Sequence, residues 1–138
     1  MRKLLFTIII ISCSTTVFCQ TQTEKFDVAK CKMKLTEYLL SCHAVIMSAL
    51  AEDDVTQKYY LGNKALEYYN YAAKQFSLLK QNTKLDETLK NDLDKTLQAY
   101  SEIVGDKSKL FKPEISFALQ IMDSKYKLKI LPKLWCDK

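Results

Sequence analysis

The spacing of apolar residues is the feature that most constrains the fold of this chain. Four segments place an apolar side chain every three or four residues, the pattern of a helix whose one face packs against other helices. With two glycines and two prolines, the chain has few residues that interrupt helices. Short connections between successive long helices favour antiparallel neighbours. The sequence therefore predicts an all-α fold, an up-down-up-down four-helix bundle.

These four segments also supply the predicted core. Its positions are, in chain order, Val28, Cys31, Leu35, Tyr38, Cys42, Val45 and Ala49; Val55, Tyr59, Gly62, Leu66, Tyr69, Ala73 and Phe76; Leu85, Leu89, Leu93, Leu97, Tyr100 and Val104; and Ile115, Leu119, Met122 and Tyr126.

Residues suited to helix starts precede three of the segments. Asp53 or Asp54 can cap the second helix, because a carboxylate accepts hydrogen bonds from the first backbone amides. Thr83 with Asp86 resembles a capping box before the third helix. Pro113 suits the first turn of the fourth, where its missing N–H is not needed.

The ends of two helices are also predicted. Gly105 stops the third helix as a residue able to adopt the left-handed conformation. The stretch "KYKLKI" alternates lysine with apolar residues, which is strand-like spacing, but it has no other strand to pair with. We interpret it as the frayed end of the fourth helix, which Pro132 stops.

The N-terminal stretch "MRKLLFTIIIISCSTTVFCQ" has the layout of an export signal. Arg2 and Lys3 precede an apolar run over 4–11, and small and polar residues follow it. Such a run is too short for a bilayer span, which needs about 20 residues. Cleavage after Cys19 would remove a signal peptide, residues 1–19, and leave one helical domain, residues 20–138, in the periplasm or outside the cell. In the alternative, Ile10 to Cys13 acts as a lipobox and Cys13 anchors a lipoprotein.

The composition of the remaining chain limits its partners. No other run is apolar enough to cross a bilayer, so stable membrane insertion is not expected. After the signal peptide the chain has 19 basic and 16 acidic side chains. This small excess does not suggest nucleic acid as a partner.

Three cysteines remain after the predicted cleavage, and an exported chain meets oxidising conditions. Cys31 and Cys42 lie 11 residues apart, which is about 16 Å along a helix. A disulfide needs Cα atoms within roughly 7 Å, so these two cannot bond and Cys136 is the partner of one of them. In the predicted topology the first helix starts where the fourth ends. This favours Cys31–Cys136, with Cys42–Cys136 as the alternative.

No arrangement of residues points to catalysis. Cys42 and His43 are adjacent, and neighbouring helical residues point about 100° apart, so the imidazole cannot readily activate the thiol. His43 and Met47 share a helix face but make a weak metal site. A single histidine excludes HExxH, and two separated glycines exclude a phosphate loop. We therefore predict no enzyme, no metal and no cofactor.

The second helix is rich in tyrosine, with five within 13 residues. Tyr59 and Tyr69 fall on its inner face. The others lie outside that face, and exposed tyrosines are enriched at protein interfaces. In the alternative, a wide core buries them. The predicted partner-binding residues are Tyr60, Lys64, Tyr68 and Tyr71.

Two short stretches, "SCHAVIMSALAEDD" and "LWCDK", carry a resemblance. With the export signal, they make the chain similar to small helical exported proteins of Gram-negative bacteria, and in outline to the amidase immunity proteins of type VI secretion. The resemblance implies a protein that neutralises a toxin in the periplasm. It also favours Cys42, rather than Cys31, as the partner of Cys136.

Two functions are compatible with these features. The first is an exported, non-enzymatic module that binds an unknown protein partner, of the inhibitor or immunity type. The second is a carrier of a small ligand or lipid, with a pocket between the helices lined by Tyr38, Phe76, Tyr100 and Met122.

Overall fold

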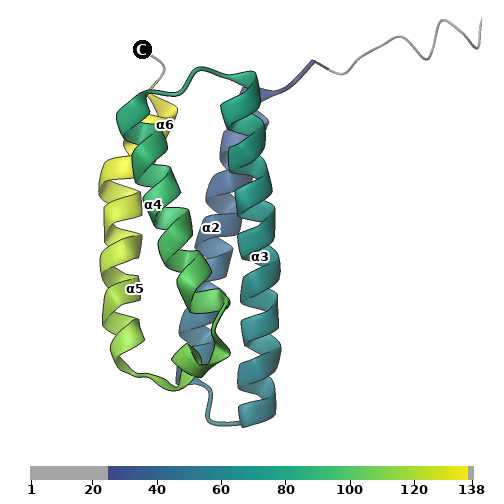
Figure 1. Cartoon of the computed structure of the whole chain (residues 1–138), viewed down its shortest axis with the longest axis vertical. Coiled ribbons are helices and arrows are strands. Elements are labelled where there is room, and N and C mark those ends of the chain that lie inside the picture. The colour runs from purple at the N-terminus through teal and green to yellow at the C-terminus, as the bar shows by residue number, and fades with distance from the viewer. Residues whose placement is uncertain (1–24, 137–138) are drawn as a thin grey trace, which may run out of the picture.

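The computed structural model describes residues 25–136 (Figure 1). The predicted signal peptide, residues 1–19, and the alternative lipid-anchored Cys13 lie outside the described residues. Within them, the helices are α2 (Val28–Ala51), α3 (Val55–Asn82), α4 (Glu87–Val104), the 3₁₀ helix η1 (Lys107–Phe111), α5 (Glu114–Lys125), the π-turn η2 (Tyr126–Ile130) and α6 (Leu131–Trp135).

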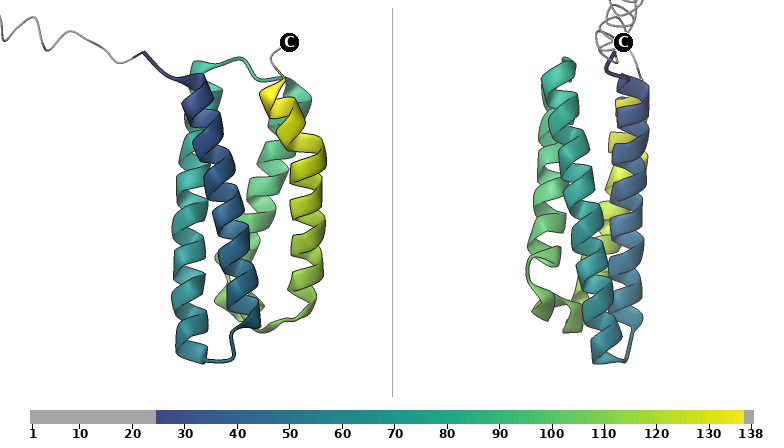
Figure 2. Two further views of the ribbon diagram at one scale, coloured as in Figure 1. Left: turned by 180° about the vertical axis from the view of Figure 1, so that it is seen from behind. Right: turned by 90° about the vertical axis from the view of Figure 1, so that its right-hand side faces the viewer.

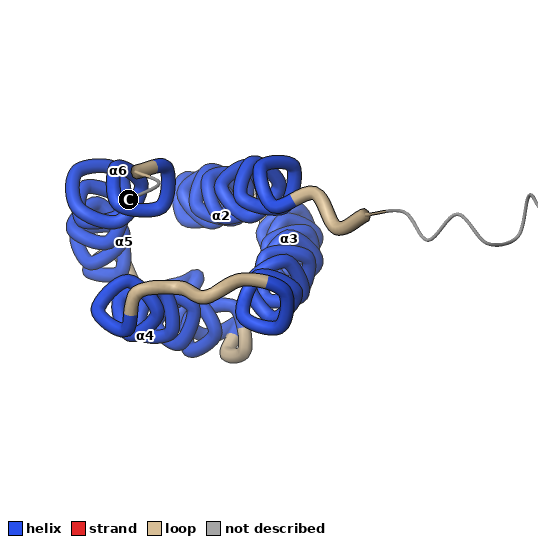
Figure 3. The backbone as a smooth tube through the Cα atoms, turned by 90° about the horizontal axis from the view of Figure 1, so that it is seen from above, coloured by secondary structure: helices blue, strands red, loops and turns tan. Residues whose placement is uncertain are grey.

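The helices form the predicted four-helix bundle. The segments α5, η2 and α6 follow one another as one column, so the bundle has four columns that run alternately down and up (Figure 1). Seen from above, α2 lies between α3 and the α5–α6 column, and α4 completes the ring (Figure 3). Figure 2 shows the same order from behind. The all-α prediction and its topology are confirmed.

Of the predicted N-terminal caps, that of α3 is confirmed and that of α4 is wrong. Asp54 caps α3, because its carboxylate accepts a hydrogen bond from the Gln57 amide at 2.8 Å. The capping box predicted from Thr83 and Asp86 is wrong. Asp86 is itself the N-cap of α4 and accepts from the Leu89 amide at 3.1 Å, while Thr83 ends α3. Helix α4 therefore starts three residues later than the capping box requires, with Asp86 in the N-cap position that the box gave to Thr83.

Two predicted helix ends also need correction. Gly105 ends α4 but is right-handed, with φ −78° and ψ −19°, so its ability to adopt a left-handed conformation is not used. Pro132 does not stop the last helix; it lies in the first turn of α6. The π-turn before it brings the Leu131 amide to the Tyr126 carbonyl, five residues back. Proline has no amide to donate, and a helix start needs none at this position.

The core lies between the four columns. On α2, α4 and the last column, most predicted positions are buried or half-buried, and Leu39, Ile46, Ile130 and Leu134 join them. On α3 the predicted face is partly wrong, because Val55 is 52% and Tyr59 is 42% exposed. Gly62 and Phe76 are buried as predicted, but the other buried residues of α3 lie beside the predicted positions: Lys58, Ala65, Ala72 and Leu79.

Small residues explain this difference. Ala65 and Ala72 are almost fully buried, and their short side chains let α3 pack closely against α2. A Cβ atom on Gly62 would lie 2.7 Å from Cδ1 of the buried Leu110, so the glycine makes room for η1. The predicted face of α3 consisted mainly of large apolar residues, whereas α3 contacts α2 and η1 through small ones.

Candidate functional site

The four predicted partner-binding residues lie on the outer side of α3. Tyr60 is 55% and Tyr71 is 43% exposed. Lys64 and Tyr68 are partly exposed, and Tyr68 also packs against the core. The alternative in which the core buries these tyrosines is therefore wrong for Tyr60 and Tyr71 and holds only in part for Tyr68.

Glu67 joins two of these residues in one network. Its carboxylate is 3.0 Å from the Lys64 ammonium and accepts a hydrogen bond of 3.0 Å from the Tyr71 hydroxyl. The hydrogen bond from Lys64, followed by that from Tyr71, lowers the pKa of Glu67. In turn, the hydrogen bond with Glu67 raises the pKa of Lys64 and that of Tyr71. These exposed contacts add little to folding stability, and they link the three side chains along α3.

A tyrosine from α2 completes the surface. The ring of Tyr38 lies 5.2 Å from that of Tyr71 and 6.5 Å from that of Tyr68, tilted by 41° and 32°. Tilted aromatic pairs at such distances attract each other. Sequence reasoning placed Tyr38 in the core, and only the pairing of α2 with α3 reveals its position. We call the following residues the tyrosine surface: Tyr38, Tyr60, Lys64, Glu67, Tyr68 and Tyr71.

Tyr59 belongs to a separate cluster at the opposite end of the bundle from the C-terminus. Its ring lies 5.8 Å from that of Phe111 and 5.9 Å from the Lys107 ammonium. Beside it, the ammonium of buried Lys58 donates to the carbonyls of Leu110 at 3.1 Å and Leu50 at 3.4 Å. These contacts join η1 to α2 and α3. The structural role of the cluster is enough to explain its residues.

The predicted disulfides Cys31–Cys136 and Cys42–Cys136 are not formed: all three cysteines are free. Cys31 Sγ donates to the Gln75 carbonyl at 3.2 Å, and Cys42 Sγ to the Ala65 carbonyl at 3.4 Å. Both thiols therefore face α3. Burial raises the pKa of Cys42 to about 12 and that of Cys31 above its ordinary value.

The reason for this correction is rotation about the helix axis. The start of α2 does lie at the same end of the bundle as the end of α6, as predicted. However, Lys32, the next residue after Cys31, shares a groove with Leu134 and Cys136. Successive helical residues point about 100° apart, so Lys32 faces Cys136 and Cys31 turns to α3.

His43 has a structural role. Its Nδ1 is 3.2 Å from the Tyr100 hydroxyl, and the two rings meet edge to face. Burial lowers the pKa of His43, and Asp123 partly opposes this. Burial also raises the pKa of Tyr100. Across residues 25–136, the structure holds no cluster of three or more His, Cys, Asp and Glu side chains that could bind a metal.

The residues predicted to line a carrier pocket do not all point to one space. Tyr38 packs in the tyrosine surface, and Tyr100, 2% exposed, fills the core beside His43. Phe76 borders an open groove between α3 and α4 with Tyr69 and Leu97. No contact among residues 25–136 favours the carrier function over protein binding.

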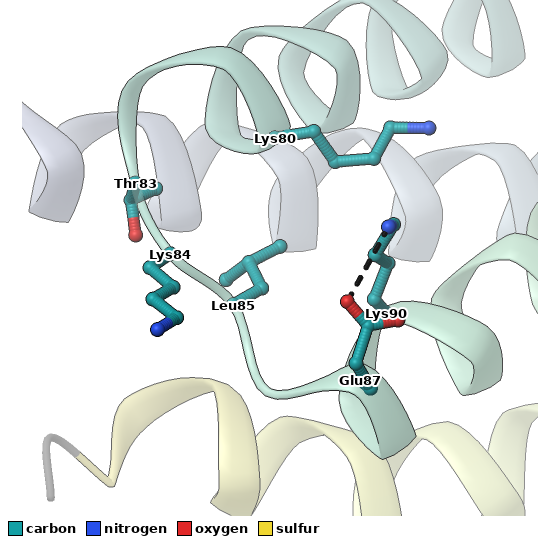
Figure 4. Close-up of a pocket in the computed structure, with 6 residues that line it drawn as sticks. All are labelled: Lys80, Thr83, Lys84, Leu85, Glu87 and Lys90. Atoms are coloured by element: carbon teal, nitrogen blue, oxygen red, sulfur yellow. Dashed lines mark ion pairs between the residues drawn. The ribbon is translucent and has the colours of Figure 1, made fainter.

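A lysine-rich groove lies at the junction of α3 and α4 (Figure 4). It is lined by Lys80, Thr83, Lys84, Leu85, Glu87 and Lys90. Lys90 is paired with Glu87 at 3.6 Å and Lys80 with Asp94 at 3.5 Å. Figure 4 shows Lys84 extending away from the other two lysines. These ammonium groups do not converge on a common point, so the groove is a poor anion site.

Comparisons with protein-family models, curated proteins and solved structures found no match. In the part of the chain that the structure describes, no helix has both the length and the apolar character needed to cross a membrane.

Proposed function

We propose that this chain is an exported, non-enzymatic protein-binding module of the inhibitor or immunity type, acting in the periplasm or outside the cell. Its binding face is the tyrosine surface. The observation that carries the proposal is the exposure of Tyr60 and Tyr71 on a long, regular helix, beside Tyr38 and Tyr68. Tyrosine is among the residues most enriched at binding hot spots.

The second argument is rigidity. Binding costs free energy when flexible side chains become ordered, and residues already fixed in the free protein avoid part of that cost. In the free protein Glu67 already contacts both Lys64 and Tyr71, and the ring of Tyr38 packs beside that of Tyr71 from α2. The surface also offers four tyrosine hydroxyl groups and the Lys64 ammonium, which is paired with Glu67, around an aromatic centre. This mixture suits a partner with an apolar patch bordered by carbonyl or carboxylate oxygens.

The test is affinity capture from a membrane-free periplasmic extract of the source bacterium. The bait is the native protein, beside a Tyr60→Ser/Tyr71→Ser variant and a matched control, Phe117→Ser/Ile121→Ser. The control also removes two exposed apolar side chains, but on α5. We expect one protein to be retained by the native and control baits and lost with the tyrosine variant.

The readout must exclude unfolding. Tyr60 and Tyr71 are exposed, so the variant should keep its helicity and melt within about 3 °C of the native protein. Tyr68 is left intact because it packs against the core. If both double variants retain the same protein as the native bait, the tyrosine surface is not the binding face.

A further inference from the structure

The outer face of α5 and α6 carries large apolar side chains that the bundle leaves uncovered. Phe117 is 69%, Ile121 54%, Leu128 77% and Trp135 45% exposed. Phe117 and Ile121 are four residues apart and share one side of α5, and Leu128 and Trp135 continue the exposed apolar surface through η2 and α6. We call these four residues the apolar stripe. It extends over 19 residues, and the 18 steps between its ends give about 27 Å at the rise of an α-helix.

Lysines border the apolar stripe on both sides. Lys125, Lys129 and Lys133 are spaced by four residues and form one row. Lys125 approaches Asp92 of α4 at 3.7 Å, which places this row on the α4 side. Lys127 lies on the other side, toward α2, where it pairs with Asp123 at 2.7 Å and acts electrostatically on His43.

The charge of this region is strongly one-sided. Between residues 112 and 135 the chain has five lysines and two acidic residues. One of the two acids, Asp123, is already paired with Lys127. Lys129 and Lys133 are exposed, and none of the ion pairs within residues 25–136 includes either of them. The apolar stripe therefore lies in a positively charged surface. A partner surface that matches it should carry negative charge.

We propose that this face binds reversibly to the surface of a bilayer rich in anionic phospholipids. Apolar residues that include Trp, Phe and Leu, bordered by lysines, are typical of helices that lie in the membrane interface. Each lysine near such a surface gains from the negative potential of the lipid headgroups. The long lysine stems cover apolar surface while their ammonium groups remain at the headgroups.

A lipid surface suits this face better than an acidic protein. The apolar stripe continues along the whole α5–α6 column with exposed lysines beside it, and an anionic bilayer surface offers an apolar layer and negative headgroups over that whole length. The surface is also separate from the proposed protein-binding face. The α5–α6 column and α3 lie at opposite sides of the ring of helices (Figure 3). A lipid-bound molecule therefore leaves α3 accessible.

The test uses sedimentation with vesicles of phosphatidylglycerol and phosphatidylcholine, and with vesicles of phosphatidylcholine alone. Trp135 is the only tryptophan of the chain, so its fluorescence reports directly on the proposed contact. We expect the protein to sediment with the anionic vesicles only, with a blue shift of its emission. Because the attraction is partly electrostatic, added salt should release the protein.

Three variants locate the contact. Lys129→Gln/Lys133→Gln should weaken vesicle binding by about fivefold for each lysine removed. Phe117→Ser/Leu128→Ser should weaken it by about tenfold or more, because the interface gains from buried apolar area. The control, Tyr60→Ser/Tyr71→Ser, should bind as the native protein does. All six side chains are exposed, so helicity and melting should be unchanged.

Three results would overturn the proposal. The first is no binding to anionic vesicles, and the second is equal binding to neutral ones. The third is a protein that does not bind vesicles and is a dimer by light scattering, while the Phe117→Ser/Leu128→Ser variant is a monomer. That outcome would assign the apolar stripe to a second copy of the chain.

Discussion

Replacing Lys58 by methionine should destabilise the bundle more than any other lysine substitution on α3. Lys58 is only 7% exposed, and its ammonium satisfies the carbonyls of Leu50 and Leu110. Leu50 lies in the last turn of α2, where backbone carbonyls lack helical partners and the helix dipole is negative. Methionine keeps most of the stem but removes the donor and the charge.

The magnitude follows from the groups left behind. A buried carbonyl without a hydrogen bond costs about 1–3 kcal/mol. The Lys58 ammonium also lies 5.1 Å from the centre of the Phe111 ring, a contact worth about 0.5–2 kcal/mol. The relief of ammonium desolvation offsets part of this loss. We expect a net loss of about 2–3 kcal/mol, which lowers Tm by about 10 °C in a domain of this size.

Urea unfolding followed by circular dichroism measures this loss. The control is Lys74→Met on the exposed side of α3, which should change stability by less than about 0.5 kcal/mol. The slope m should be the same for both variants, because the area exposed on unfolding does not change. If Lys58→Met and Lys74→Met unfold at the same urea concentration, Lys58 does not hold α2 and η1 together.

Three further predictions concern the thiols, a helix cap and the histidine. In the folded protein a thiol reagent should modify Cys136 quickly and the two buried cysteines only after unfolding; a disulfide-linked peptide on non-reducing mapping would contradict the free thiols. Asp86→Ala should cost about 1 kcal/mol and Thr83→Ala much less, and the reverse order would restore the capping box. Burial holds the pKa of His43 below its unfolded value of about 6.5. At a pH between the folded and the unfolded pKa, unfolding therefore takes up a proton. Stability should thus decrease as pH falls from 7 to 5, and a His43→Gln variant with an unchanged pH profile would refute this.

The fold was predictable because its signals are local. Helical spacing identifies all four columns, and Asp54 caps α3 through residues three positions away. The errors arise where two elements meet. The buried face of α3 depends on how closely Gly62 and Ala65 allow its neighbours to approach. The π-turn before Pro132 lets the chain continue into α6, and the lysine–apolar alternation of this stretch did not indicate it.

The candidate site was predictable to the same extent. Angular positions on one helix placed Tyr60 and Tyr71 outside the core, and the structure finds them exposed. Tyr38 could not be added, because its contact with Tyr71 spans two helices and depends on their register. The cysteines show the same limit. Topology put Cys31 at the correct end, but only the rotation of α2 decides which residue faces Cys136.

The most direct test of the proposed function is a calorimetric titration of the captured partner into the native protein and into Tyr60→Ser/Tyr71→Ser. Two tyrosine anchors contributing over 1 kcal/mol each predict a Kd at least about 30-fold weaker for the variant. The control Phe117→Ser/Ile121→Ser should retain the native Kd. A Kd for the tyrosine variant within about threefold of the native value would contradict the assignment of the tyrosine surface as the binding face.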